Sequence, residues 1–416
     1  MSLQDKIDKL CTDAKTASYS LAQASLSTRN NALAILADKL VSTEAMDAIL
    51  AANKVDSEGA RGNISDAMFD RLKLDEARIT NISGALRKII NLADPLNNGD
   101  VWTRPNGMII KKVRVPLGVI GMIYESRPNV TVDAAALCIK SGNAVVLRGG
   151  KEAINTNTVL ADLVKQSLSE SGLDSNCVQF IDDTSRDSAN ILMQQRGKID
   201  VLIPRGGASL IQNVAQNSNV PVIETGVGNC HIYVDKSADF DVAANIILNA
   251  KTRASVCNAV ETILISQEIY KDFLPIMKAR LDEKLNVELR GCARTCEILG
   301  CTEATDEDYH TEYLDFILNV KVVAGLNEAI EHINKHGTQH SEAIITRDIR
   351  NAREFQERVD AAAVYVNVST RFTDGEEFGF GAELGISTSR LHARGPVGLS
   401  ELTTVKYLID GDDLVR

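Results

Sequence analysis

The chain has 416 residues, which predicts two to three domains at roughly 150 residues each. Hydrophobic residues make up 44% of it, charged residues 24% and aromatic residues 4%, a balance that excludes a disordered, collagenous or disulfide-dense protein. The 45 basic and 56 acidic side chains give a formal net charge of −11. This charge disfavours nucleic-acid binding, because that binding depends on cations that neutralise phosphates.

Hydropathy and the first residues indicate a cytoplasmic protein. No stretch approaches the ~18 consecutive apolar residues of a membrane span, and charged residues soon follow Met1, where a signal peptide would be apolar. We therefore expect neither a membrane partner nor a nucleic-acid partner. In the cytoplasm the eight cysteines are expected to be reduced thiols.

The first hundred residues are predicted to be helical. Residues 2–5, Ser-Leu-Gln-Asp, resemble a capping box, and apolar residues then recur at helical spacing. A second helical run is expected over 31–40 and a third from Ser42. Residues 59–63, which contain two glycines, are expected to form a loop.

From Trp102 onward the pattern predicts strands. Asn106-Gly107 indicates a hairpin turn that leads into a strand over 108–115. Short apolar runs then alternate with helical segments, which predicts parallel sheets of the α/β class. The expected strands of a first series are 119–124, 144–147, 178–181, 201–203 and 221–223. A second series has strands at 231–234, 260–266, 343–346 and 362–367, a helix at 241–250, and a terminal strand at 402–409.

Two strand ends carry cations and glycines. Arg148-Gly149-Gly150-Lys151 follows one expected strand, and Arg205-Gly206-Gly207 follows another and opens a helix. Ligands bind at the carboxyl ends of strands in open α/β sheets, and helix N-termini accept anions. Each run alone is equally compatible with a solvated basic turn, but two such ends in one sheet favour a phosphate-bearing ligand. The chain contains neither a G-x-G-x-x-G motif nor a P-loop.

Cys257 is the candidate nucleophile, between a predicted helix and a predicted strand. Lys251 and Arg253 are cationic neighbours that favour a thiolate. A structural role remains the alternative for any one of eight cysteines.

Two other clusters are weighed as metal sites. Cys292, Cys296 and Cys301 lack a second ligand pair, so they are expected to be ordinary loop thiols. His332 and His336 can share a helix face as metal ligands, but Gly337 is expected to end that helix before His340. Histidines that bond helix-end carbonyls are favoured instead, and no metal is expected.

Several of these segments together resemble one family. The most specific match is the run 323–344, and the segments 116–151, 222–234, 249–262 and 364–406 match as well. They resemble the γ-glutamyl phosphate reductases (glutamate-5-semialdehyde dehydrogenases) of the aldehyde dehydrogenase superfamily. The resemblance implies an aldehyde dehydrogenase-like fold with three parts: a Rossmann-like, parallel-sheet NADPH-binding domain over 1–100 and 118–228, an α/β catalytic domain over 229–391, and a small β oligomerisation element over 101–117 and 392–416.

The resemblance also implies roles for single residues. Cys257 matches the nucleophile, Asn129 is the candidate oxyanion donor, and Glu224 matches the carboxylate that activates water in hydrolytic relatives. The implied cofactor-binding residues are Arg148, Lys151, Gly206, Gly207 and Glu312. The candidate substrate-binding residues are Arg127, Arg253 and Arg371.

The implied reaction is the reduction of L-glutamyl 5-phosphate by NADPH to L-glutamate 5-semialdehyde and phosphate, through a thioester on Cys257. This is the second step of proline biosynthesis from glutamate, and the product cyclises to 1-pyrroline-5-carboxylate. Lys151 stands where NAD-preferring members carry a glutamate, which favours NADPH over NADH. Because forward turnover needs no activated water, Glu224 either steers the cofactor or has no role.

Two other functions and two partner predictions stay open. A hydrolytic aldehyde dehydrogenase would be favoured by Glu224 but not by Lys151, and a catalytically silent scaffold is disfavoured by the intact Cys257. The hairpin and the terminal strand resemble an oligomerisation element, so a homo-oligomer, a dimer or a dimer of dimers, is expected. Docking with glutamate 5-kinase is a hypothesis motivated by the lability of the acyl phosphate.

Overall fold

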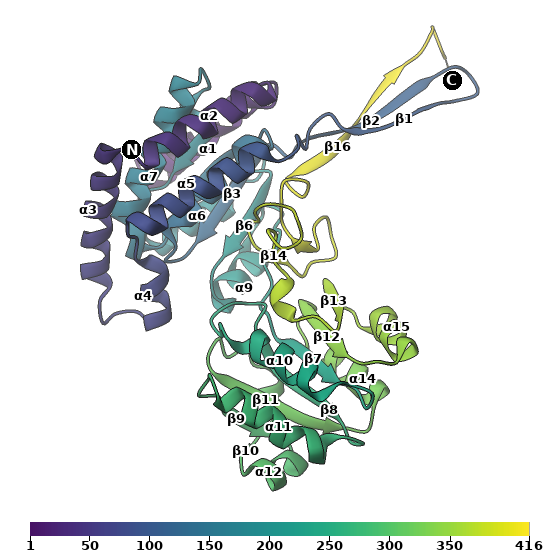
Figure 1. Cartoon of the computed structure of the whole chain (residues 1–416). Helices are drawn as coiled ribbons and strands as arrows, with labels where there is room; N and C mark the ends of the chain where they lie inside the picture. Colours follow the sequence, from purple (N-terminus) through teal and green to yellow (C-terminus); the bar gives the residue numbers. More distant parts are fainter. Residues whose placement is uncertain (416) are drawn as a thin grey trace. The chain divides into compact units, whose positions relative to one another are not determined.

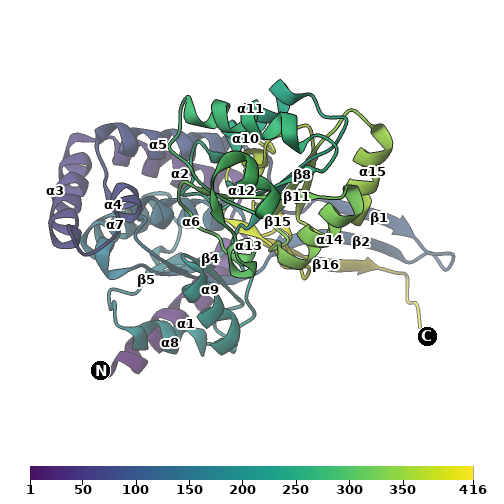
Figure 2. The same cartoon turned by 90° about the horizontal axis from the view of Figure 1, so that it is seen from below.

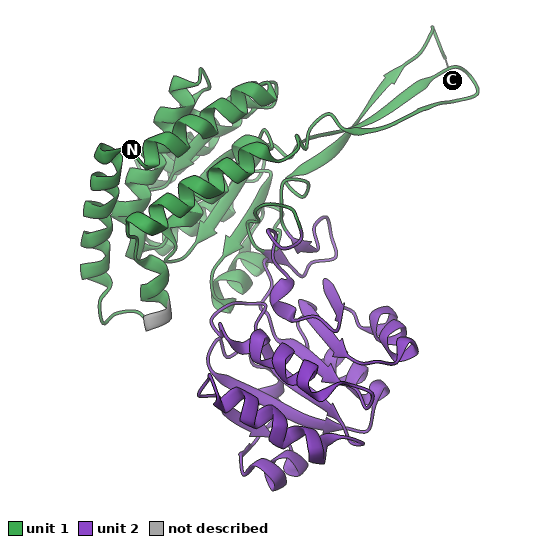
Figure 3. Ribbon diagram, viewed as in Figure 1, with its two compact units in different colours: residues 1–224, 379–385, 397–416 green, residues 225–378, 386–396 purple. Residues whose placement is uncertain are grey.

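The computed structural model describes residues 1–415, without the side chains of residues 66 and 67. It divides into two compact units (Figure 3). Unit 1 comprises Met1–Glu224, Gly379–Gly385 and Val397–Arg416, and unit 2 comprises Thr225–Phe378 and Ile386–Pro396. Relative to the expected domain limits, residues 101–117, 379–385 and 397–416 belong to unit 1, and residues 225–228 and 392–396 belong to unit 2.

Helices form the first part of unit 1 (Figure 1). They are α1 (Leu3–Leu21), α2 (Leu26–Leu40), α3 (Thr43–Ala60), α4 (Asp66–Leu72) and α5 (Glu76–Asn91). The predicted capping box is confirmed, because Ser2 and Asp5 bond each other's backbone N–H groups. Helix α2 begins five residues before the expected position, since the Ser25 hydroxyl accepts from the Thr28 N–H and caps it there.

A four-stranded parallel sheet follows, with the order β5-β4-β3-β6. Its strands are β3 (Val119–Tyr124), β4 (Ala144–Arg148), β5 (Val178–Phe180) and β6 (Val201–Arg205). The crossover segments are α6 (Pro128–Lys140), η1 (Lys151–Ala153), α7 (Ile154–Glu170), η2 (Ser175–Cys177) and α8 (Arg186–Met193), and α9 (Ala208–Asn217) follows β6. The strand expected over 221–223 was wrong: only Val222 forms a bridge, to Leu202, through the bonds from Leu202 N–H to Pro221 O and from Ile223 N–H to Leu202 O. The ladder does not continue because Pro204, the next residue of β6 on that side, has no N–H to donate.

A separate antiparallel sheet joins β1 (Gly99–Thr103), β2 (Ile109–Pro116) and β16 (Thr403–Asp410). The predicted hairpin and terminal strand are therefore confirmed. Trp102 pairs with Ile110, and Lys112 pairs with Tyr407, so β2 is the central strand. Figure 1 shows the three strands side by side.

Unit 2 contains a seven-stranded parallel sheet with the order β10-β9-β11-β8-β7-β12-β13. Its strands are β7 (Cys230–Val234), β8 (Val260–Ser266), β9 (Glu288–Gly291), β10 (Thr302–Glu303), β11 (Ile317–Val323), β12 (Ser341–Ile345) and β13 (Ala363–Val366). The helical segments are α10 (Phe240–Lys251), α11 (Tyr270–Asp282), α12 (Ala293–Leu299), α13 (Asp306–His310), α14 (Leu326–His336), α15 (Ile349–Arg358) and η3 (Thr370–Phe372). A small pair is formed by β14 (Ile386–Ser387) and β15 (Gly395–Pro396).

The sheet of unit 2 is buried on both faces, which explains the continuous apolar runs of its strands. Ile232 on β7 packs into one cluster with Phe273 of α11. The next residue, Tyr233, packs into another with Phe355 of α15. Helices α10 and α11 thus cover one face and α14 and α15 the other, as Figures 1 and 2 show. None of the described helices has the length and apolar character needed to cross a membrane.

Candidate active site

The polar chemistry of unit 2 gathers at the amino edge of its sheet. Strands β11, β8, β7 and β12 are adjacent and parallel, so their first residues share one edge. Glu312 precedes β11, Cys257 precedes β8, Asn229 precedes β7 and His340 precedes β12. This edge is opposite to the carboxyl edge of the sheet, at which ligands of open α/β sheets are expected.

Cys257 has a half-exposed thiol on a tightly held backbone. The Cys230 thiol donates to the Cys257 carbonyl oxygen at 3.3 Å. Gly228 packs so closely that a Cβ there would lie 1.5 Å from the same oxygen, so only glycine fits. The Gly228 N–H in turn donates to Glu312 Oε1 at 2.7 Å. Three neighbouring loops thus fix the main chain beneath the thiol.

Asn258, which sequence reasoning missed, connects Cys257 to Arg371. Its side-chain amide donates to the carbonyl oxygens of Arg371 and Thr373 at 3.1 and 3.0 Å, and the Arg371 guanidinium donates to Asn258 Oδ1. Burial lowers the pKa of Arg371 and the charge of Arg253 lowers it further, whereas Cys257 opposes the shift. Arg371 therefore bonds the residue that follows Cys257, and the charges of Cys257 and Arg253 both act on it. The only signal for Asn258 in the sequence is its position as an amide residue shortly before the buried apolar strand β8.

Lys251, expected to act on the thiol, faces Glu261 instead. Its Nζ lies 2.7 Å from Glu261 Oε2, and both side chains are fully buried. Burial raises the pKa of Glu261 to about 7 and lowers the pKa of Lys251. Glu261 Oε1 also accepts from the Leu314 N–H at 3.3 Å. The pair thus joins the end of α10, the start of β8 and the loop that carries Glu312.

The predicted glycine turn of unit 1 already holds an anionic oxygen. Gly207 caps α9, and its N–H donates to Glu125 Oε2 at 2.8 Å. A Cβ at Gly206 would meet the same oxygen at 2.5 Å. A carboxylate therefore occupies a helix N-terminus of the kind that binds phosphate. Sequence reasoning missed Glu125, although it is the acidic residue that directly follows β3.

The two cations at the end of β4 differ in their hydrogen bonds and in their exposure. The Arg148 guanidinium donates to the carbonyl oxygens of Thr184 and Ser185 at 2.7 and 2.8 Å, so it braces the loop before α8. Burial lowers the pKa of Arg148, which Asp183 partly opposes. Lys151, the first residue of η1, is exposed and thus accessible to a ligand.

The other predicted site residues of unit 1 lie near α6 or at the limit of the unit. Asn129 is in the first turn of α6 and donates to Asp133 Oδ2 at 2.9 Å. Burial raises the pKa of Asp133 to about 6. Arg127 is the N-cap of α6, and Glu224, the last residue of the segment Met1–Glu224, is exposed. Their expected meeting with Cys257 of unit 2 stays a prediction.

The histidine run behaves partly as predicted. Helix α14 ends at His336 with Gly337 as its cap, and the rings of His332 and His336 stack at 4.3 Å. His332 Nδ1 bonds Lys321 Nζ at 3.2 Å, not a carbonyl oxygen, so that expectation was wrong for His332.

One aspartate and two histidines form a possible metal site. Asp306, His310 and His336 place possible ligand atoms within 4.8 Å of one another. Lys335 Nζ, however, lies 3.7 Å from the Asp306 carboxylate and opposes a metal cation there. That no metal is needed stays a prediction.

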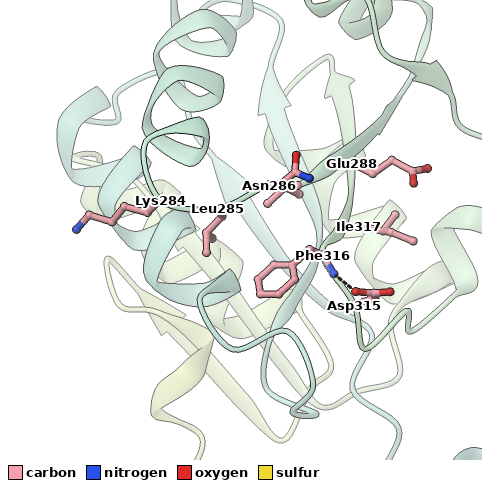
Figure 4. Close-up of a pocket in the computed structure, with 8 residues that line it drawn as sticks. Lys284, Leu285, Asn286, Glu288, Asp315, Phe316 and Ile317 are labelled. Carbon is pink, nitrogen blue, oxygen red and sulfur yellow. Dashed lines mark hydrogen bonds between the residues drawn. The ribbon is translucent and has the colours of Figure 1, made fainter. Parts of the chain in front are cut away.

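A hollow of about 600 Å³ opens on unit 2 where β9 and β11 begin (Figure 4). It is lined by Lys284, Leu285, Asn286, Val287, Glu288, Asp315, Phe316 and Ile317. In Figure 4 the Lys284 ammonium lies on the left, away from the Glu288 and Asp315 carboxylates on the right. The hollow therefore lacks the converging polar groups of a reaction centre.

Comparisons with known proteins place this geometry in a family. The model of the aldehyde dehydrogenase family matches residues 2–298 and 297–408. The gamma-glutamyl phosphate reductase of Clostridium acetobutylicum is 54% identical over 422 residues, which cover 100% of both chains. The chain belongs to the γ-glutamyl phosphate reductases of the aldehyde dehydrogenase family.

Other members of the γ-glutamyl phosphate reductase family agree with this placement. The gamma-glutamyl phosphate reductase of Caldicellulosiruptor bescii is 53% identical, again over 100% of both chains. The crystal structure of gamma-glutamyl phosphate reductase from Thermotoga maritima is 46% identical, with a TM-score of 0.95 over 99% of each chain. The family resemblance and the α/β aldehyde dehydrogenase fold expected from the sequence are therefore confirmed.

Proposed function

We propose that the chain reduces L-glutamyl 5-phosphate to L-glutamate 5-semialdehyde and phosphate, the second step of proline biosynthesis from glutamate, with Cys257 as the nucleophile. Family membership supports the reaction, and one observation supports the residue: the half-exposed Cys257 thiol at the amino edge of the sheet. The product then cyclises to 1-pyrroline-5-carboxylate without further help.

The acyl step requires a thiolate and little else. The Cys257 sulfur attacks the acyl carbon, the bond from that carbon to the phosphate oxygen breaks, and phosphate leaves with the electron pair. Phosphate is a good leaving group, so no strong general acid is needed. Negative charge develops on the acyl oxygen, where the Cys257 N–H and the Asn129 amide are the candidate donors. The bonds from Cys230 and Gly228 to this loop keep its backbone fixed during the attack.

A reductase of this family works with a nicotinamide cofactor, and we propose NADPH as its source of hydride when bound. Two observations support the fit: the Gly206–Gly207 turn already holds an anionic oxygen, and Lys151 is an exposed cation after β4. The Lys151 ammonium would attract the 2′-phosphate of NADPH. The glutamate that NAD-preferring members carry at this position would repel it. Glu312 would hold the nicotinamide ribose. Arg148 would support the cofactor site at the end of β4 by bracing the loop before α8.

Substrate charge supports roles for the arginines. The substrate carries a phosphate and an α-carboxylate, and the charges of both Arg253 and Cys257 act on Arg371. We propose that these two guanidinium groups bind the anionic groups, with Arg127 as a third contributor. Glu224 is not needed for forward turnover, because activated water would hydrolyse the thioester.

The antiparallel sheet supports self-association. Val101, Tyr407 and Ile409 expose more than half of their surface on β1 and β16, although they are apolar or aromatic. Strand β1 pairs only with β2 among the described residues, so its other edge is open for pairing. We propose a homo-oligomer, a dimer or a dimer of dimers, built through this sheet. Docking with glutamate 5-kinase and a cytoplasmic location stay predictions.

The reverse reaction tests this function. The protein is supplied with L-glutamate 5-semialdehyde and NADP+, and NADPH formation is followed by absorbance with and without phosphate. We expect turnover only with phosphate, its loss in Cys257→Ala, and its retention in Cys292→Ser, a matched change of another half-exposed thiol. Turnover without phosphate would identify a hydrolytic aldehyde dehydrogenase instead.

A further inference from the structure

Three of the four half-exposed thiols of the chain lie around α12, and the fourth is Cys257. Cys292 is the N-cap of α12, Cys296 lies within it, and Cys301 follows it. The loop expected here was wrong, because residues 293–299 form a helix. These three thiols have no part in the proposed reaction.

The end of α12 brings two of the thiols together. The Gly300 N–H donates to the Cys296 carbonyl at 2.9 Å, and Gly300 adopts a left-handed conformation with φ of 63°, which reverses the chain. Cys301 then returns beside Cys296, and the two Sγ atoms lie 3.0 Å apart. A Cβ at Gly291 would lie 2.9 Å from Cys301 Sγ, so the glycine leaves room for this sulfur. The thiols therefore need no helix unwinding to meet.

We propose that Cys296 and Cys301 form a reversible redox-modification site, which a low-molecular-weight disulfide converts into an internal disulfide. A protein disulfide is about 2.05 Å long, so the sulfurs must approach by roughly 1 Å. Both side chains are half-exposed, so a small oxidant can reach them.

The exchange occurs in two balanced steps. The first protein thiolate attacks one sulfur of the small disulfide, the sulfur–sulfur bond breaks, and one small thiolate leaves. The second protein thiol loses its proton and displaces the other small thiolate. The two protein sulfurs are oxidised, and the small disulfide is reduced to two thiols.

The surroundings assign the order of attack. Burial raises the pKa of Cys301 to about 12, and its contact with Cys296 adds to the rise. Cys301 therefore keeps its proton longer, and Cys296 attacks first. Cys292 competes, because hydrogen bonds from Thr295 and Val322 outweigh its burial and lower its pKa.

Trypsin separates the competing thiols. Cleavage after Arg294 and Lys321 gives a peptide 295–321 that contains Cys296 and Cys301 and no other cysteine. Cys292 falls in peptide 291–294 and Cys257 in peptide 254–271. The full chain is incubated with oxidised glutathione, remaining thiols are alkylated with iodoacetamide, and peptides are weighed without reductant.

The expected product is peptide 295–321 lighter by two hydrogens, without glutathione or alkyl groups, and restored by dithiothreitol. Cys296→Ser should abolish this species, and Cys301→Ser should instead retain glutathione on Cys296, because the second step is removed. Cys292→Ser should leave the disulfide unchanged. A doubly alkylated peptide 295–321, or glutathione retained on it in the unchanged chain, would overturn the proposal, and neither result bears on the reaction at Cys257.

Discussion

The two parallel sheets carry their candidate site residues at opposite edges. In unit 1 the glycines and cations lie at the carboxyl ends of β4 and β6, and the Gly207 N–H at the start of α9 donates to the Glu125 carboxylate. In unit 2 the Cys257 thiol precedes β8 and Glu312 precedes β11, while Glu261 is the second residue of β8. An anion site needs exposed backbone donors, whereas a nucleophile needs a fixed backbone and an accessible side chain. The fold class alone therefore does not predict at which edge of a parallel sheet the candidate site residues lie.

The buried ion pair of unit 2 gives the largest expected effect. Glu261→Gln leaves the Lys251 ammonium without its anion in an apolar interior, which should cost about 3–5 kcal/mol of unfolding free energy. Urea unfolding followed by circular dichroism measures this loss.

The exposed pair Lys236–Glu268 is the matched control, and Glu268→Gln should change little. The double variant Lys251→Met with Glu261→Leu should recover most of the stability, because no charge is left buried. Equal stability of Glu261→Gln and Glu268→Gln would show that the pair does not fix the amino edge.

Alanine substitutions at Gly228 and Gly207 test how tightly the backbone is packed at the two edges. Gly228→Ala forces a methyl group against the Cys257 carbonyl, which should cost about 1–3 kcal/mol and shift the thiol. At Gly207 an added Cβ meets only Glu125 Oε2, at 3.9 Å, so Gly207→Ala should preserve the fold. Thermal unfolding and the rate of thiol alkylation of peptide 254–271 measure both. Similar losses of thermal stability in the two variants would contradict the claim that the backbone is held more tightly at the amino edge of unit 2 than at the carboxyl edge of unit 1.

The smallest expected effect is a change in cofactor preference when Lys151, at the carboxyl edge of the unit 1 sheet, is substituted. Lys151→Glu replaces an exposed cation by an anion that repels a 2′-phosphate, so the NADPH:NADH ratio of kcat/KM should fall about tenfold, or ~1.4 kcal/mol. Lys165→Glu, a charge reversal on α7, is the control and should leave the ratio unchanged. An unchanged ratio in Lys151→Glu would remove the assignment of this lysine.

Local patterns predicted the strands and the glycine turns but not the long-range polar contacts. Strands β3 and β8 were confirmed with their expected limits, since uninterrupted apolar runs specify buried strands. Strand β11 was missed because Asn319 and Lys321 interrupt its apolar pattern. Asn319 donates to the Asp308 carbonyl and Lys321 bonds His332, so both are satisfied by partners on other elements.

The site shows the same limit. Arg253 and Arg371 were expected near Cys257; Arg253 and Cys257 both act on the pKa of Arg371, and their roles in the site stay predictions. Glu125 was missed because its partner Gly207 lies 82 residues away. Glu261 was missed because it sits in an apolar strand pattern, where it pairs with Lys251 at the end of the preceding helix and with the Leu314 N–H 53 residues away. No local spacing reports such contacts, which arise only when parallel strands place distant loops at one edge.

The most direct test of the account is to trap the acyl group on the nucleophile. The protein is mixed with freshly generated L-glutamyl 5-phosphate without cofactor, quenched in acid and digested, and peptide 254–271 is weighed. We predict a glutamyl thioester on Cys257, released by hydroxylamine and absent in Cys257→Ala. An unmodified peptide 254–271 together with a glutamyl adduct on another peptide would contradict the central role of Cys257.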